Sequence, residues 1–161
     1  MLDKLNLEGK TIVVTGGGSG LGKAMSLALA EAGADVVVAA RRQNLIDETA
    51  SEIQNIGRRS LAIATDVTDS KQIENLFSIV RKEFGKIDVL INNAGIVRGQ
   101  TPKPIWEITD EEWREGMDVN LSSTFYCSRA VAQEMTERGS GKIINVASGL
   151  GFRGANNNYM Y

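Results

Sequence analysis

A glycine-rich turn that directly follows an apolar segment constrains the fold more than any other feature of this sequence. The apolar segment is Ile12–Val14, and the turn Thr15–Gly22 (Thr-Gly-Gly-Gly-Ser-Gly-Leu-Gly) opens an amphipathic helical stretch. A strand-to-helix turn without side chains lets phosphate groups approach the N–H groups at a helix N-terminus. A second motif, Asn92–Gly95 (Asn-Asn-Ala-Gly), follows another apolar segment, Val89–Ile91. The second motif would end beside the first. Together the two motifs predict a domain that binds a nicotinamide dinucleotide.

Segments with strand and helix patterns alternate along the chain. The clearest helix pattern is Ser70–Phe84, whose apolar residues recur with the period of a helix packed on one face. Alternation of this kind predicts right-handed crossovers and a parallel sheet. We expect one α/β domain over residues 1–161, a doubly wound parallel sheet (Rossmann fold) with strand order 3-2-1-4-5. The expected strands are Thr11–Thr15, Asp35–Ala40, Ser60–Thr65, Asp88–Ile91 and Lys142–Val146, and the expected helices are Gly20–Ala32, Asn44–Ile56, Ser70–Phe84 and one that begins at the capping box Thr109–Glu112 and ends near Arg138.

Charge and residue usage argue against several classes of protein. The net charge is -2 without a basic stripe, so nucleic acid is not an expected partner. No apolar run approaches the roughly 20 residues that span a bilayer, and the first residues lack a long apolar segment, so we expect neither a membrane nor export but a cytoplasmic location. The absence of histidine excludes an imidazole base. The single cysteine, Cys127, excludes an internal disulfide and a multi-cysteine zinc site, and no metal site is expected.

The glycine turn also has a rival interpretation. Gly17-x-x-x-x-Gly22-Lys23 nearly matches the P-loop pattern, which ends in Lys followed by Ser or Thr. The next residue is Ala24, which has no hydroxyl to bind Mg²⁺. The actual spacing is Thr-Gly-x-x-x-Gly-x-Gly, and we prefer a dinucleotide turn. Lys23 either adds positive potential there or lies on a solvated helix face.

The end of the second expected strand favours NADP(H), with NAD(H) as the other possibility. Domains that prefer NAD place an acidic residue there to bind the ribose 2′-hydroxyl. This chain has Ala40-Arg41-Arg42, and one or two guanidinium groups could pair with a 2′-phosphate. After the third expected strand, Asp66 could accept a hydrogen bond from the adenine amino group or cap the following helix, with Thr68 and Asp69 as alternative caps.

These motifs, taken together, resemble those in the N-terminal part of proteins of the short-chain dehydrogenase/reductase family. The resemblance covers essentially the whole chain. Members of this family include 3-oxoacyl thioester reductases and gluconate-type dehydrogenases. The resemblance implies cofactor contacts from the glycine turn, from Arg41 and Arg42 after the second strand, from the adenine pocket and from the Asn-Asn-Ala-Gly motif. These residues are Gly16, Ser19, Gly20, Leu21, Gly22, Arg41, Arg42, Asp66, Val67, Asn93, Ala94 and Gly95.

The same resemblance implies catalytic roles for three residues. Tyr161, thirteen positions after Ser148, would exchange a proton with the substrate oxygen. Ser148 would hydrogen-bond that oxygen, and Asn120 would hold the helix and a water molecule. Tyr159 is an alternative acid whose spacing fits the family less well. A free tyrosine has a pKa of about 10, so the family's lysine and the oxidised nicotinamide are needed to lower it.

That lysine would lie four positions after Tyr161, where the sequence has no residue. We therefore expect a fragment that lacks the last strands of the sheet, is inactive alone, exposes a sheet edge and belongs to a homotetramer or dimer. A natural truncation is the less favoured alternative. The expected substrate is a small carbonyl or alcohol compound, either a 3-oxoacyl thioester or a sugar, polyol or gluconate-type molecule. Loop residues Arg98, Lys103 and Arg153 could attract an anionic one. A non-catalytic NAD(P)-binding regulatory module is the alternative function.

Overall fold

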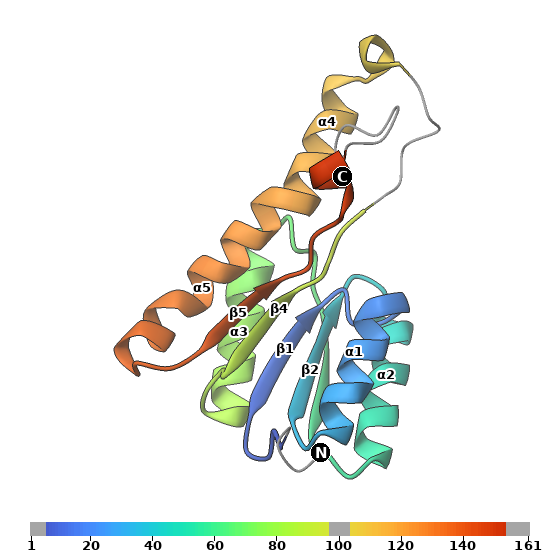
Figure 1. Ribbon diagram of the computed structural model, residues 1–161. Helices are drawn as coiled ribbons and strands as arrows, with labels where there is room; N and C mark the ends of the chain where they lie inside the picture. Colours follow the sequence, from blue (N-terminus) through green and yellow to red (C-terminus); the bar gives the residue numbers. More distant parts are fainter. Residues whose placement is uncertain (1–5, 97–103, 154–161) are drawn as a thin grey trace.

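The computed structural model describes residues 6–96 and 104–153, which form a parallel five-stranded sheet with helices on both faces (Figure 1). The strand order β3-β2-β1-β4-β5 confirms the predicted order. Every neighbouring pair is parallel, with Ile12 of β1 opposite Val36 of β2 and Val89 of β4. The strands are β1 (Thr11–Thr15), β2 (Asp35–Ala40), β3 (Ser60–Ala64), β4 (Val89–Asn92) and β5 (Lys142–Asn145).

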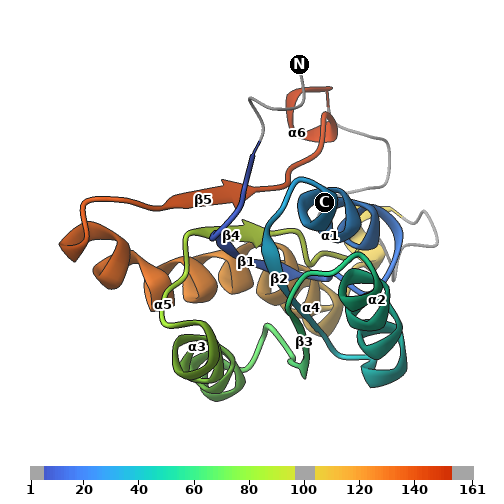
Figure 2. The ribbon, with the colours of Figure 1, turned by 90° about the horizontal axis from the view of Figure 1, so that it is seen from below.

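Two helical layers cover the sheet (Figure 2). Side chains of β1 alternate between them, because successive residues of a strand point to opposite faces. Ile12 and Val14 pack with α1 (Gly20–Glu31) and α2 (Gln43–Asn55). Val13 packs instead with α3 (Ser70–Phe84) and α5 (Ser123–Glu137). The central strands are therefore buried on both faces, and their carboxyl ends are held at fixed positions relative to one another.

Local signals explain where α3 begins and ends. The Asp69 side chain accepts hydrogen bonds from the backbone N–H groups of Lys71 and Gln72, and Gly85 ends the helix with φ of 79°. The predicted bounds of this helix are confirmed. The first two strands also have their predicted bounds, whereas the other strands and the first two helices differ from the predicted bounds by one residue at one or both ends.

The long helix expected from the capping box to about Arg138 is confirmed in its extent, but it is not α-helical throughout. Its start is confirmed, because Thr109 and Glu112 form the capping box, but α4 (Asp110–Met117) passes into a π-helical segment, Asp118–Ser122, before α5 begins. A π-helical turn accommodates one residue more than an α-helical turn, and such turns are frequent at functional sites. Short helices also occur at Ile105–Glu107 and, as α6, at Leu150–Arg153.

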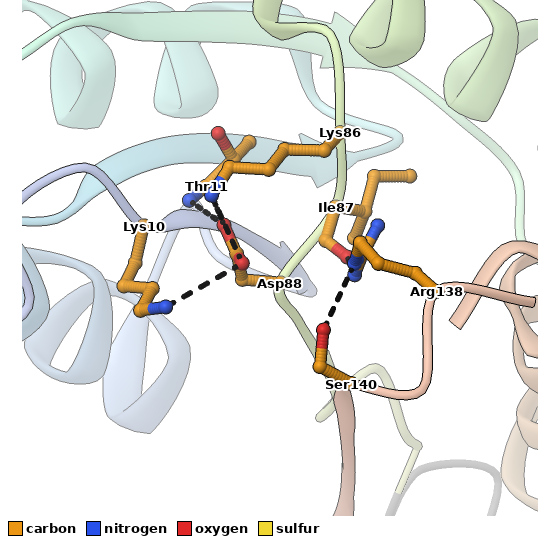
Figure 3. Close-up of polar contacts among 7 residues, drawn as sticks. All are labelled: Lys10, Thr11, Lys86, Ile87, Asp88, Arg138 and Ser140. Atoms are coloured by element: carbon orange, nitrogen blue, oxygen red, sulfur yellow. Dashed lines mark hydrogen bonds and ion pairs between the residues drawn. The ribbon is translucent and has the colours of Figure 1, made fainter. Parts of the chain in front are cut away.

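A half-buried carboxylate ties the amino ends of β1 and β4 together (Figure 3). Asp88 accepts a hydrogen bond from the backbone N–H of Thr11 at 3.0 Å, and its carboxylate lies 3.2 Å from Lys86 Nζ and 3.7 Å from Lys10 Nζ. Nearby, Arg138 after α5 donates to the Ile87 carbonyl oxygen at 2.7 Å. These contacts lie at the end of the sheet away from the glycine turn, so their role is structural.

β5 is an exposed edge among the described residues, where it pairs only with β4. Its side chains Ile143 and Ile144 are 37% and 46% exposed, and on the adjoining helical face Leu121 and Phe125 are 58% and 57% exposed. The expected exposed sheet edge is therefore accompanied by exposed apolar side chains. Within the described ranges no helix has both the length and the apolar character that crossing a membrane requires.

Candidate functional site

A pocket of about 370 Å³ lies at the carboxyl ends of the central strands. The glycine turn after β1, the residues after β2 and β3, and the Asn-Asn-Ala-Gly segment after β4 all contribute to it. Ligands of open α/β sheets bind at this kind of position, next to the point where the strand order reverses. All cofactor residues predicted from the sequence line this pocket except Gly20: Gly16, Ser19, Leu21, Gly22, Arg41, Arg42, Asp66, Val67, Asn93, Ala94 and Gly95.

The glycine turn has a backbone that side chains would disrupt. Gly16 adopts φ of 69° and Gly20 φ of 53°, both in the left-handed region that favours glycine. A Cβ atom on Gly22 would collide with the Gly16 carbonyl oxygen and lie 2.6 Å from Asn93 Nδ2. Gly20 does not line the pocket, and its positive φ contributes to the shape of the turn. Because the turn stays bare, backbone N–H groups at the start of α1 remain accessible to a phosphate.

Thr15, the last residue of β1, joins the two motifs, and the prediction of site residues from the sequence did not include it. Its Oγ1 accepts hydrogen bonds from the backbone N–H groups of Asn93 and Ala94, each at 3.1 Å. In return, Asn93 Nδ2 donates to the Thr15 carbonyl oxygen at 3.0 Å. A signal existed in the sequence, because Thr15 and Asn93 stand at the ends of neighbouring strands in the predicted order.

The three basic residues near the turn have different surroundings. Lys23 pairs with Glu48 at 2.7 Å and Glu52 at 2.8 Å, which joins α1 to α2. The hydrogen bonds to these two glutamates raise the pKa of Lys23, foremost the one to Glu48. The positive charge of Lys23 is therefore compensated by two carboxylates of α2. This pairing argues against a P-loop lysine that binds phosphate.

Arg41 and Arg42 both line the pocket. Arg42 Nη2 donates to Ser19 Oγ at 3.0 Å, whereas Arg41 is exposed and forms no hydrogen bond or ion pair with any residue that the structure describes. Neither α1 nor α2 has an acidic residue in its first turn. The rim at the ends of β1 and β2 therefore presents positive charge and helix N-termini without a nearby first-turn carboxylate, which suits phosphate groups.

Asp66 forms a turn rather than the cap of α3. Its Oδ1 accepts hydrogen bonds from Thr68 N at 2.9 Å and Thr68 Oγ1 at 2.8 Å. The cap is Asp69, whose pKa is lowered by the hydrogen bond from the Gln72 side chain and by those from backbone N–H groups. Of the alternatives for Asp66, helix capping is therefore wrong, and the carboxylate stays at the wall of the pocket beside the buried Val67.

A second pocket of about 460 Å³ adjoins the first. Both are lined by Leu21 and by Asn93–Gly95. The structure brings two predicted catalytic residues, Asn120 and Ser148, to this second pocket. Tyr161 lies outside the described residues, as do Tyr159, Arg98 and Lys103. The remaining lining residues are Leu121, Thr124, Asn145, Val146, Ala147 and Gly151.

Asn120 sits in the π-helical segment and holds the chain that follows β4. Its Oδ1 accepts from the Ile96 backbone N–H at 2.8 Å, and its Nδ2 donates to the Ile96 carbonyl oxygen at 3.0 Å. Ser148 is half-buried, and its Oγ accepts a hydrogen bond from the backbone N–H of Leu150 at 3.1 Å. This leaves the Ser148 hydroxyl proton for another acceptor, since that bond uses only a lone pair.

Comparison with known proteins agrees with this geometry. The chain is 38% identical over 157 residues to 2-dehydro-3-deoxy-D-gluconate 5-dehydrogenase of Dickeya dadantii (strain 3937), which covers 96% of the chain and 59% of the relative. It is 37% identical over 151 residues to 3-oxoacyl-[acyl-carrier-protein] reductase FabG of Escherichia coli (strain K12). This match covers 93% of the chain and 59% of the relative. The chain thus spans about three fifths of the length of these relatives.

Solved structures share the fold. A metagenomic short-chain oxidoreductase in complex with NADP matches with a TM-score of 0.90 and 32% identity over 96% of this chain and 69% of that one. An NAD⁺-bound xylitol dehydrogenase matches with a TM-score of 0.88 and 28% identity. This match covers 94% of this chain and 57% of the xylitol dehydrogenase chain. The family model for short chain dehydrogenases matches residues 10–161, so the chain belongs to the short-chain dehydrogenase family.

Proposed function

We propose that the protein is an NADP(H)-dependent oxidoreductase that transfers a hydride between the nicotinamide and a carbonyl or secondary alcohol group. The observation that carries this proposal is the pair of adjoining pockets at the carboxyl ends of the strands. The first has the bare turn and basic rim that a dinucleotide requires, and the second presents Ser148 and Asn120. The wall shared by both pockets, Leu21 and Asn93–Gly95, is where a nicotinamide ring would meet its substrate.

The residues after β2 support NADP(H) over NAD(H). No carboxylate follows Ala40 that would bind a ribose 2′-hydroxyl or repel a 2′-phosphate. Arg41 is instead exposed at the pocket rim, and the N-terminus of α2 next to it favours negative charge. The adenine ring would lie against Val67, with the Asp66 carboxylate as acceptor for its amino group.

The chain's own residues supply positioning and proton transfer, while the bound nicotinamide supplies the hydride chemistry. Ser148 Oγ would donate its proton in a hydrogen bond to the substrate carbonyl oxygen. Tyr161 would give the phenolic proton to the same oxygen during reduction and take it back during oxidation. Asn120, bonded to both polar groups of the Ile96 backbone, fixes the wall of the pocket in which these groups act.

Two substrate classes fit the second pocket, a 3-oxoacyl thioester and a sugar- or polyol-type alcohol. The two relatives compared above are named for one class each. The pocket is lined by apolar side chains such as Leu121 and Val146 together with polar ones such as Thr124 and Asn145. That mixture accommodates an acyl chain or a hydroxylated chain, so both belong in the test.

The experiment measures NADPH and NADH binding and turnover in the intact protein. We expect tighter binding of NADPH, reduction of an acetoacetyl thioester or of a keto-sugar acid, and loss of turnover with retained binding in Tyr161→Phe. Arg41→Ala should remove the preference for NADPH and leave NADH binding unchanged. Cofactor binding without turnover of either substrate class would instead indicate the non-catalytic module, and failure to bind either cofactor would overturn the proposal.

A further inference from the structure

A polar network connects the interior of the fold to the second pocket. Asn92, the last residue of β4, is only 5% exposed, and it lies opposite Asn145, the last residue of β5. Asn92 Nδ2 donates to Asn145 Oδ1 at 2.9 Å and to Ser128 Oγ of α5 at 3.2 Å. Asn145 in turn lines the second pocket together with Ser148. A buried side chain therefore holds one that borders the pocket in which Ser148 lies.

The sheet itself sets the direction of the Asn92 side chain. Leu90 packs in the core with Cys127 and Val131 of α5. Asn92 follows two residues later on the same strand, so its side chain points to the same face of the sheet. It therefore contacts Asn145 from the side covered by α5, and the register of β4 against β5 fixes this contact.

The Asn92 amide is turned so that its donors are used and its oxygen is not. Both hydrogen bonds of the side chain start from Nδ2. Oδ1 is buried and has no hydrogen-bond partner in the described structure. Because a buried acceptor without a partner costs stability, such an exception calls for a role other than stability. The orientation of this amide has one clear consequence, which is that Asn145 is bound by its oxygen.

Asn145 is thereby left with hydrogen-bond donors. Its Oδ1 accepts from Asn92, whereas its Nδ2 forms no hydrogen bond with any residue that the structure describes. The side chain is exposed at the pocket. Exchanging the oxygen and nitrogen of the Asn145 amide would place two N–H groups against each other, so the bond from Asn92 opposes that rotation.

The other two asparagines of the second pocket are engaged differently. Asn93 Nδ2 donates to the Thr15 carbonyl oxygen at 3.0 Å. Asn120 bonds the backbone of Ile96 through both its amide oxygen and its amide nitrogen. Of the three amide groups that line this pocket, that of Asn145 therefore has its nitrogen available for a ligand in the described structure.

We propose that Asn145 is a specificity-determining residue of the second pocket and that Asn92 is its positioning residue. With its oxygen held by Asn92, Asn145 donates from Nδ2 to a second oxygen atom of the substrate, near the carbonyl oxygen that Ser148 binds. The pocket then favours a ketone with a further acceptor oxygen close to the reacting carbon over one with hydrocarbon there. This assignment rests on the proposed function, because it requires a carbonyl substrate beside Ser148.

The test compares two ketones in which an oxygen replaces a methylene group, methoxyacetone and 2-pentanone. The ether oxygen accepts a hydrogen bond but cannot donate one. The values of kcat/KM with NADPH are measured for both ketones in the intact protein and its variants. The ratio between the ketones, compared with the parent's ratio, cancels their different intrinsic reactivities. Asn145→Leu should lower this ratio about tenfold, the effect of one hydrogen bond, and leave 2-pentanone reduction nearly unchanged.

Asn92→Leu tests the positioning role. It removes the bond to Asn145 together with the unpaired buried oxygen, so the fold should remain stable, which a melting temperature checks. The ratio should fall at least about threefold and should fall no further in the double variant than in Asn145→Leu alone. If Asn92→Leu unfolds, Asn145→Asp is measured instead, because it keeps the acceptor for Asn92 and loses the donor, and the same fall is expected.

Two controls separate this effect from general ones. Thr124→Val removes another polar group of the same pocket and should leave the ratio unchanged, whatever it does to the individual rates. Ser60→Ala removes a buried hydrogen bond, from Ser60 Oγ to the Val36 carbonyl oxygen at 2.7 Å, at a position that lines neither of the two pockets. It should lower stability without changing the ratio, as a merely structural role would.

The outcomes separate this proposal from the one on which it rests. If the parent reduces carbonyl substrates but Asn145→Leu leaves the ratio unchanged, or Thr124→Val lowers it equally, the role of Asn145 is wrong and the proposed function stands. The same holds if the parent reduces other carbonyl substrates but not methoxyacetone. A fall in Asn145→Leu without one in a folded Asn92→Leu would overturn the positioning role. If the parent reduces no carbonyl compound, both proposals fail.

Discussion

Thr15 and Asn93 hold the two motifs of the site together through reciprocal hydrogen bonds. Thr15 Oγ1 accepts from the Asn93 backbone N–H at 3.1 Å, and Asn93 Nδ2 donates to the Thr15 carbonyl oxygen at 3.0 Å. The threonine side chain is buried and Asn93 is half-buried. The end of β1 and the end of β4 are thereby fixed relative to each other, and the wall between the two pockets depends on this connection.

Replacing Thr15 with valine, which has the same shape, should destabilise the fold and weaken cofactor binding. The change leaves the backbone N–H groups of Asn93 and Ala94 without their acceptor, and an unpaired buried donor costs about 1–3 kcal/mol. We expect the free energy of unfolding, measured by urea denaturation, to fall by at least about 2 kcal/mol. Thr136→Val, at an exposed position of α5, is the matched control. Equal stability of the two variants would contradict the role of Thr15.

Gly22→Ala should remove dinucleotide binding, since a methyl group there has no room. Its Cβ would overlap the Gly16 carbonyl oxygen and press on Asn93 Nδ2 at 2.6 Å, so the turn must open. Ser51→Ala is the control, because Ser51 is exposed on α2 and lines neither pocket. Calorimetric titration with NADPH checks both variants. Unchanged affinity in Gly22→Ala would show that the turn is not the diphosphate site.

The Asp88 cluster at the amino ends of β1 and β4 predicts a dependence of stability on pH. Burial of Asp88 is the largest single influence and raises its pKa, but the hydrogen bond from Thr11 N and the Lys86 and Lys10 charges together lower it below the usual value. Since an unfolded aspartate titrates at about 3.9, ionised Asp88 stabilises the fold above that pH. This contribution is lost as the pH falls through the folded-state pKa.

Asp88→Asn should therefore lower the free energy of unfolding at neutral pH by about 1.5–3 kcal/mol, the range for a hydrogen bond to a charged group. The difference from the parent should shrink as the pH falls below the unfolded pKa and approach a constant once Asp88 is protonated in both states. Urea denaturation at several pH values measures it. Glu115→Gln, which alters an exposed carboxylate of α4, should show no such trend. A difference between Asp88→Asn and the parent that does not change with pH would contradict the interpretation.

The sequence predicted those features that depend on local patterns. The bounds of α3 follow from its apolar period, the Asp69 cap and Gly85, all of which lie within or beside the helix. The strand order follows from alternation and handedness, which need no knowledge of individual contacts. The glycine turn was predicted because phosphate-binding turns require a particular backbone, and glycine spacing in the sequence reports it directly. The full set of pocket residues, by contrast, came from the resemblance to the short-chain dehydrogenase/reductase family.

Features that depend on contacts between distant residues were not predicted. The π-helical segment has no distinct period in the sequence, and its Asn120 forms hydrogen bonds to the distant Ile96 backbone. The role of Thr15 depends on the register of β1 against β4, which places its hydroxyl beside two particular N–H groups. The pairing of Lys23 with Glu48 and Glu52 likewise depends on how α1 packs on α2.

Cys127 should be unreactive toward thiol reagents in the folded protein. Its side chain is fully buried in the core between the sheet and α3, among residues such as Phe77, Leu90 and Val131, and burial raises the pKa of the thiol to about 12. The thiolate that attacks such reagents is therefore scarce even at pH 8, and the core excludes the reagent itself. Titration with a chromogenic disulfide should give no reaction without denaturant and one equivalent in urea, with a labelling rate that follows the unfolded fraction. Rapid labelling in the native state would place Cys127 at the surface and contradict the packing of α5 on α3.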